Sequence, residues 1–151
     1  MQILKHSKYQ IIIFVLAILG FLDSLYFSIE HYRKVIPPCV TGFRCDIVTT
    51  SEYAYMFGIP VAYMGLVYYL LLFAFSILFF EKDENNVSSH KILRALQIIS
   101  GIGFLASLRF TYIQAFVIEA WCLYCIFSAL TTTLIFATTF LESKKTTGKF
   151  V

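Results

Sequence analysis

Four long apolar runs constrain the fold of this chain more than any other feature. They cover residues 9–29, 59–80, 95–118 and 120–141, and the only charges inside them are Asp23 and Arg109. About 20 apolar residues are enough for a helix to cross a bilayer, and hydrocarbon offers the backbone no hydrogen-bond partner outside its own segment. We therefore predict an all-α membrane protein, in which residues 1–151 form a single integral membrane domain with a four-transmembrane-helix bundle.

The composition supports a membrane protein. Charged residues make up 14% of the chain, compared with roughly 25% in soluble domains. The formal net charge is +3, but no basic stripe with interleaved aromatics lies outside the apolar runs, so we expect no nucleic-acid partner. A signal peptide over residues 1–25 is an alternative for the first run. We favour a membrane span, because the run is long and no small-residue cleavage site precedes Asp23.

The distribution of basic residues predicts the orientation. Eight of the twelve Lys and Arg residues lie in the two tails or between the second and third runs, whereas three lie in the loop at residues 30–58. Cytoplasmic segments carry the excess of Lys and Arg. We therefore expect an integral protein of the plasma (inner) membrane with both termini in the cytoplasm. The loop at 30–58 and the short turn at Glu119 and Ala120 then face outward.

All four cysteines fall on or near this outer side. Cys39 and Cys45 lie in the loop, and Cys122 and Cys125 open the fourth run. Residues three apart share a helix face, and a thiol in the first turn has its pKa lowered by unpaired backbone N–H groups. We predict that Cys122 and Cys125 carry redox chemistry at the edge of the hydrocarbon, where a lipid-soluble quinone is a suitable reactant.

Other roles for the cysteines are open. Cys122 and Cys125 could be small buried apolar residues, Cys39 and Cys45 could form a static structural disulfide, and four thiolates could bind zinc. Two pairs on one side favour exchange instead, because a thiolate can pass a disulfide from one pair to the other. We expect no metal site, since the three histidines lie apart in tails and loops.

Between the loop cysteines and the second run, we predict a short helix over residues 50–57. The pattern Thr49-x-x-Glu52 is typical of a capping box, and Gly58 would end the helix. We expect this helix to lie as a lid over the region of Cys122.

The order of these motifs resembles the vitamin K epoxide reductase family in its bacterial and archaeal form. Cys39 and Cys45 are followed six residues later by Ser51, then by Gly58-Ile59-Pro60 with Gly65, and last by the pair that opens the fourth run. Quinone reductases of the DsbB type also have four spans and two cysteine pairs. They place C-x-x-C in the first outer loop, however, so the order here favours the former family.

The resemblance implies a relay of electrons. A separate thioredoxin-like, DsbA-type protein would attack the Cys39–Cys45 disulfide at Cys39, and Cys45 would then meet Cys122. Cys125 would pass the electrons to a quinone of the ubiquinone or menaquinone type. The resemblance also implies that Ser51 acts at the site through a hydrogen bond to the substrate or to a thiolate. The alternative is a simple serine at the start of a helix.

Three further expectations concern the spans. The animal enzymes carry Asn and Tyr where this chain has Val61 and Ala129, which argues against vitamin K epoxide as the substrate. Asp23 and Arg109 have opposite charges at a similar depth, so we predict that they pair. Aromatic residues of the spans could line a quinone pocket or simply pack; examples are Tyr63, Tyr68 and Phe104.

Two functions from other classes compete with the enzyme. One is a non-enzymatic accessory membrane subunit with a structural loop disulfide. The other is a transporter, which is disfavoured because the chain lacks matched pairs of helices broken by Gly or Pro.

Overall fold

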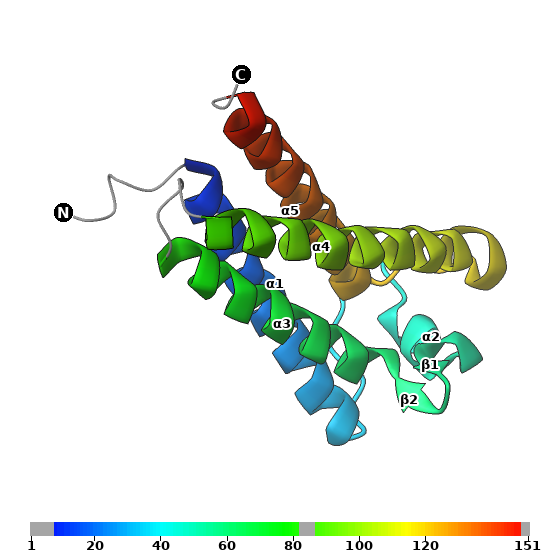
Figure 1. The fold of residues 1–151 in the computed structure, drawn as a ribbon. Helices are drawn as coiled ribbons and strands as arrows, with labels where there is room; N and C mark the ends of the chain where they lie inside the picture. Colours follow the sequence, from blue (N-terminus) through cyan, green and yellow to red (C-terminus); the bar gives the residue numbers. More distant parts are fainter. Residues whose placement is uncertain (1–7, 82–86, 149–151) are drawn as a thin grey trace.

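The computed structural model describes residues 8–81 and 87–148. Its four long helices are α1 (Lys8–Tyr32), α3 (Val61–Glu81), α4 (Val87–Ile113) and α5 (Leu123–Gly148) (Figure 1). A π-helical turn, η3 (Gln114–Ile118), continues α4. All four helices are long and apolar enough to cross a membrane. The predicted four-helix membrane bundle is therefore confirmed.

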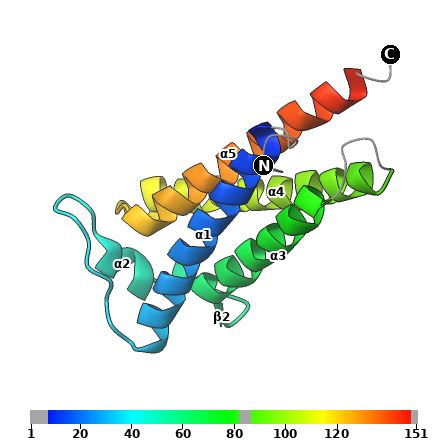
Figure 2. The same ribbon diagram turned by 90° about the vertical axis from the view of Figure 1, so that its left-hand side faces the viewer.

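The four helices close a ring. Both α1 and α4 pack against α3 and α5, and Figure 2 shows α1 running beside α3. The inner faces bury an apolar core, which is formed by Ile13, Ala17, Tyr69, Leu72, Phe79, Leu93, Leu96 and Ile135. Large apolar side chains such as Leu22, Ile102 and Leu105 are exposed on the outside. This arrangement suits a lipid surround, in which outward apolar side chains meet hydrocarbon rather than water.

Contacts around Tyr69 join three of the helices near the middle of the bundle. The Tyr69 hydroxyl donates to the Ser128 carbonyl at 2.8 Å and also lies 2.8 Å from the Thr132 hydroxyl. Gly20 of α1 faces the Tyr69 ring so closely that a Cβ atom at this position would overlap it. Small residues and hydroxyl groups are common where helices meet within membranes. Gly20 and Tyr69 thus bring α1, α3 and α5 together.

The segment between α1 and α3 folds at one end of the bundle. It contains the short helix α2 (Cys45–Thr50), the 3-10 helix η2 (Glu52–Ala54) and the strands β1 (Tyr55–Met56) and β2 (Ile59–Pro60). The strands are antiparallel, with Met56 opposite Ile59. Phe57 and Gly58 connect them with φ values of 53° and 79°. Two successive positive φ angles are typical of the type I′ turn of a tight hairpin.

The helix predicted over residues 50–57 is wrong. The helix begins earlier, at Cys45, and ends before Ser51, which is extended with φ −68° and ψ 157°. The Thr49 hydroxyl donates to the Asp46 carbonyl at 3.2 Å, so the predicted capping box does not form. The physical reason is the turn at Phe57 and Gly58, which requires the extended pairs Tyr55–Met56 and Ile59–Pro60 on its two sides and leaves room only for the short 3-10 helix at Glu52–Ala54.

Candidate functional site

The two loop cysteines form a disulfide. Cys39 and Cys45 are bonded, with their Cα atoms 6.1 Å apart. Cys45 is the first residue of α2 and has no exposed surface, whereas Cys39 is half-buried. The Phe43 N–H donates to the Val40 carbonyl at 3.0 Å and closes the turn between them. Cys39 is thus the more accessible sulfur of the pair.

The second pair consists of free thiols at the start of α5. Cys122 directly precedes Leu123, the first residue of the helix, so it lies at the N-cap rather than in the first turn. Its carbonyl accepts the Ile126 N–H at 3.0 Å. Its sulfur accepts the backbone N–H groups of Tyr124 and Cys125. The helix terminus therefore points its unpaired donors at one sulfur atom.

These contacts lower the pKa of the Cys122 thiol, which lies ahead of the membrane-spanning part of α5. The largest cause is a hydrogen bond from the Cys125 thiol, and the two backbone N–H groups add to it. Burial acts in the opposite direction, since it disfavours the charged form. Cys122 is consequently suited to act as a thiolate, either attacking or leaving in thiol–disulfide exchange.

Two hydrogen bonds hold the loop against the C-x-x-C turn. The Arg44 N–H donates to the Trp121 carbonyl at 2.9 Å, and the Tyr124 hydroxyl donates to the Pro38 carbonyl at 2.9 Å. Arg44 and Trp121 each precede a buried cysteine. As a result, one buried cluster contains Cys45, Val48, Ala120 and Cys122, with Cys39 and Cys125 packed against it. The structure thus gathers all four cysteines at one end of the bundle.

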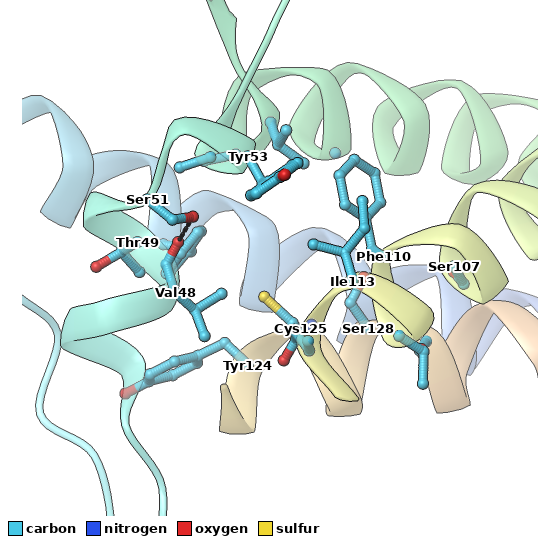
Figure 3. A pocket seen from close by; sticks show the side chains of 18 of the residues that line it. Val48, Thr49, Ser51, Tyr53, Ser107, Phe110, Ile113, Tyr124, Cys125 and Ser128 are labelled. Carbon is cyan, nitrogen blue, oxygen red and sulfur yellow. Dashed lines mark hydrogen bonds between the residues drawn. The ribbon is translucent and has the colours of Figure 1, made fainter. Parts of the chain in front are cut away.

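A cavity of about 140 Å³ lies beside Cys125. Figure 3 shows the Cys125 sulfur directed toward the space bordered by Val48, Tyr53 and Ile113. Apolar side chains from every long helix contribute to its walls, including Phe27, Val61, Phe110 and Ala129. An apolar cavity of roughly 150 Å³ is large enough for a benzene ring. The residues present therefore fit an aromatic or quinone ring next to a thiol.

Ser51 lies on the wall of this cavity. Its hydroxyl donates to the Val48 carbonyl at 2.8 Å (Figure 3). Although Ser51 precedes the 3-10 helix η2, its side chain makes no cap hydrogen bond. The hydroxyl hydrogen is thus used at the end of α2, and the oxygen can still accept a hydrogen bond from the cavity.

The predicted pair of Asp23 and Arg109 is wrong. Both residues are described, and no ion pair joins them: Asp23 lines the cavity, whereas Arg109 is exposed. The cavity face of α4 carries Ser107, Thr111 and Gln114. A helix turns by 100° per residue, so Arg109 points to the opposite side.

The sequence prediction missed this polar face of α4. Its spacing of four and then three residues places Ser107, Thr111 and Gln114 on one helical stripe in an otherwise apolar run. That spacing was the signal that could have found them. The aromatic residues named from the sequence have packing contacts instead, since Tyr68 packs on Tyr69 and Phe104 stacks on Phe136.

Comparison with known proteins is consistent with the cysteine arrangement. A family model described as "Vitamin K epoxide reductase family" matches residues 11–140, which is most of the chain. No curated protein matches the chain. The chain therefore belongs to the vitamin K epoxide reductase family, as an integral membrane protein and a thiol–disulfide oxidoreductase.

Proposed function

We propose that this oxidoreductase uses a membrane quinone to re-oxidise a separate thioredoxin-like, DsbA-type protein outside the cytoplasm. Electrons pass from Cys39 and Cys45 to Cys122 and Cys125, and then to the quinone. One observation carries the proposal. The loop disulfide lies in the same buried cluster as Cys122, while Cys125 faces a cavity of ring size.

The first exchange takes place at Cys39, the half-buried sulfur. A thiolate of the partner attacks Cys39, forms a mixed disulfide and expels Cys45 as a thiolate. The second thiol of the partner then attacks the partner's own sulfur in this bond and releases Cys39. The partner leaves as a disulfide, and the loop pair holds the two electrons.

The second exchange joins the two pairs. The Cys45 thiolate attacks Cys122 of a Cys122–Cys125 disulfide and expels Cys125 as a thiolate. Cys39 then attacks Cys45, which re-forms the loop disulfide and releases Cys122. The backbone N–H groups that help to lower the pKa of Cys122 also favour its release. The outcome is a loop disulfide beside two free thiols, which is the arrangement found here.

The last step needs an acceptor that is soluble in lipid. A bound quinone supplies a two-electron, two-proton acceptor, so that the thiols of Cys122 and Cys125 return to a disulfide and a quinol leaves. Val48, Phe110 and Ile113 provide apolar walls beside Cys125, and the Ser51 oxygen can accept a hydrogen bond from a hydroxyl of the quinol. A DsbA-type dithiol has a reduction potential of about −120 mV, so its re-oxidation needs an acceptor of higher potential.

The proposal also includes the membrane arrangement. Residues 1–151 form one integral domain in the plasma (inner) membrane, with both termini in the cytoplasm and the cysteines on the outer side. The excess of Lys and Arg near the two ends of the chain and over residues 82–94, which include the start of α4, supports this orientation.

Trapping the exchange between the pairs tests the relay. The double variant Cys39→Ser/Cys125→Ser retains Cys45 and Cys122, so we expect a stable disulfide between these two that mass spectrometry detects after proteolysis. The matched variant Cys45→Ser/Cys122→Ser retains the other two cysteines and should form much less cross-link. Equal cross-linking in the two variants would contradict the order of the relay.

A turnover assay tests the acceptor. Purified wild-type protein, supplied with a reduced DsbA-type donor and a soluble ubiquinone or menaquinone analogue, should form quinol. If a folded, oxidised protein reduces none of these quinones and shows no cross-link, a non-enzymatic accessory subunit with a structural loop disulfide becomes the better explanation.

A further inference from the structure

Gln114 is hydrogen-bonded directly to the redox pair. It lies in the π-helical turn η3 at the end of α4, is only 4% exposed and lines the cavity. Its side-chain Oε1 accepts the Cys122 N–H at 2.9 Å. A backbone N–H can only donate, so the amide oxygen must face Cys122 and the NH₂ group must be the other end.

The NH₂ group of this amide donates no hydrogen bond to another described residue. Among the described residues, the bond to Cys122 accounts for every side-chain hydrogen bond that Gln114 makes. Among the described residues, only the Tyr68 hydroxyl is a fully enclosed side-chain polar atom without a partner, so the NH₂ group of Gln114 keeps some exposed surface where the residue lines the cavity. An acceptor inside the cavity would satisfy it.

The backbone holds Gln114 in place. Its carbonyl accepts the Ala120 N–H at 3.1 Å, and Glu119 turns the chain back with a left-handed φ of 54°. The residue is thus fixed at its carbonyl and at its amide oxygen. Its NH₂ group is therefore pre-oriented before any ligand binds.

Several other donors on the cavity wall are engaged within the chain. The hydroxyls of Thr49, Ser51 and Tyr124 donate to backbone carbonyls. The Ser128 hydroxyl lies 3.0 Å from that of Tyr69, within a local hydroxyl cluster. Gln114 differs from these because it is nine-tenths buried, has free donors and contacts the C-x-x-C pair.

We propose that Gln114 Nε2 donates a hydrogen bond to a carbonyl oxygen of the quinone. This inference rests on the proposed function and names the group that recognises the acceptor. One amide then holds the Cys122 backbone with its oxygen and orients the ring beside Cys125 with its nitrogen. The amide gives up no proton: the two protons of the quinol derive from the two thiols. As electrons reach the carbonyl oxygen, its negative charge grows and the hydrogen bond strengthens.

A matched pair of ligands isolates the carbonyl. Duroquinone and durene (1,2,4,5-tetramethylbenzene) share a methylated ring, and durene lacks the two carbonyl groups. Binding is measured on the oxidised protein, which has no electrons to transfer. The single tryptophan, Trp121, is next to Cys122, so its quenching by duroquinone reports binding, and durene is measured as a competitor. Comparing the affinity ratio between variants cancels partition of the ligands into detergent.

The variant Gln114→Met keeps the side-chain length and removes the amide. We expect the duroquinone-to-durene affinity ratio to fall by roughly fivefold, the size of one neutral hydrogen bond, with durene binding unchanged. Gln97→Met is the control, because Gln97 is on the same helix and donates to the Thr139 carbonyl at 3.3 Å, away from the cavity. It should keep the wild-type ratio.

The outcomes separate the two proposals. An unchanged ratio in Gln114→Met, with durene still bound, overturns the role of Gln114 and leaves the proposed function intact. Failure of wild-type protein to bind duroquinone counts against the quinone function itself. Loss of durene binding in Gln114→Met would mean that the cavity has collapsed. In that case Gln114→Asn decides, because its amide is one methylene too short to reach both partners: a lowered ratio supports the proposal, and an unchanged ratio overturns it.

Discussion

The middle of the bundle and the end that carries the cysteines are both buried, but they bury different chemistry. In the middle, the Tyr69 hydroxyl is bonded to Ser128 and Thr132, and Gly20 admits the aromatic ring at close range. At the cysteine end, the fully buried residues include Cys45 and Cys122, and a cavity lies beside them. The hydroxyl bonds of Tyr69 in the first region are made within the chain, whereas the second region contains a disulfide bond and thiols that can be exchanged.

Stability and turnover are therefore expected to depend on separate parts of one small chain. Changes in the middle should lower the free energy of unfolding and leave the chemistry of each folded molecule unaltered. Changes at the cysteine end should lower turnover and leave the free energy of unfolding little changed.

The largest effect is expected for Cys125→Ala. Without the second sulfur no Cys122–Cys125 disulfide can form, so quinone-dependent turnover should fall to background. Thermal stability should change little, because alanine retains most of the packing of a half-buried cysteine. In the control Cys39→Ala, turnover should be lost with the protein donor and kept with dithiothreitol. Quinol formation by Cys125→Ala at a measurable rate would show that the relay does not pass through this thiol.

The next largest effect is expected for a substitution in the middle of the bundle. In Gly20→Ala the new Cβ atom overlaps the Tyr69 ring, and overpacking of this kind costs about 1–3 kcal/mol. Thermal unfolding in detergent should therefore occur at lower temperature, with normal turnover per folded molecule. Gly101→Ala is the matched control, since its Cβ would lie 3.4 Å from the Phe136 ring, an ordinary contact. Equal stability of the two variants would refute the close approach of α1 and α3.

The bundle could be predicted from the sequence because hydrocarbon leaves an apolar run little choice of structure. The segment between α1 and α3 was harder to predict. The pattern Thr49-x-x-Glu52 suggested a helix start, but the threonine hydroxyl bonds back to Asp46. The turn at Phe57 and Gly58 governs this segment, and the left-handed Phe57 is a conformation that aromatic residues rarely adopt. A local pattern was overruled by the hairpin that connects the loop to α3.

The candidate site could also be predicted only in part from the sequence. The grouping of Cys39, Cys45, Cys122 and Cys125 followed from the motif order, and the polar stripe on α4 was visible in its spacing. The contact between Gln114 and Cys122 could not be predicted from the sequence, because it depends on a π-helical turn and on the left-handed backbone of Glu119. Neither the π-helical turn nor the left-handed residue can be recognised from the residue types, because these residues also favour an ordinary helix.

A third prediction concerns the pKa of Cys122 in a background with Cys39→Ser and Cys45→Ser. The hydrogen bond from Cys125 stabilises the Cys122 thiolate and is the largest cause of its lowered pKa. Replacing Cys125 by alanine should therefore raise this pKa, so that the ultraviolet absorbance of the thiolate appears at higher pH. The same background with Cys122→Ala gives the contribution of Cys125 alone. A midpoint that stays in place or moves to lower pH would show that the helix terminus, not Cys125, controls the thiol.

The smallest effect is expected for Ser51→Ala. The hydroxyl donates to Val48 and leaves its oxygen lone pairs toward the cavity that Cys125 also borders. Removing one hydrogen bond to a ligand or thiol should slow turnover by between about twofold and tenfold. Thr49→Ala is the matched control, because Thr49 also lines the cavity and donates to a carbonyl of α2, and it should remain near wild type. Equal small losses in the two variants would assign Ser51 to the structure of α2, so that disulfide exchange at the cysteine end would depend on the cysteines and the groups that hold them.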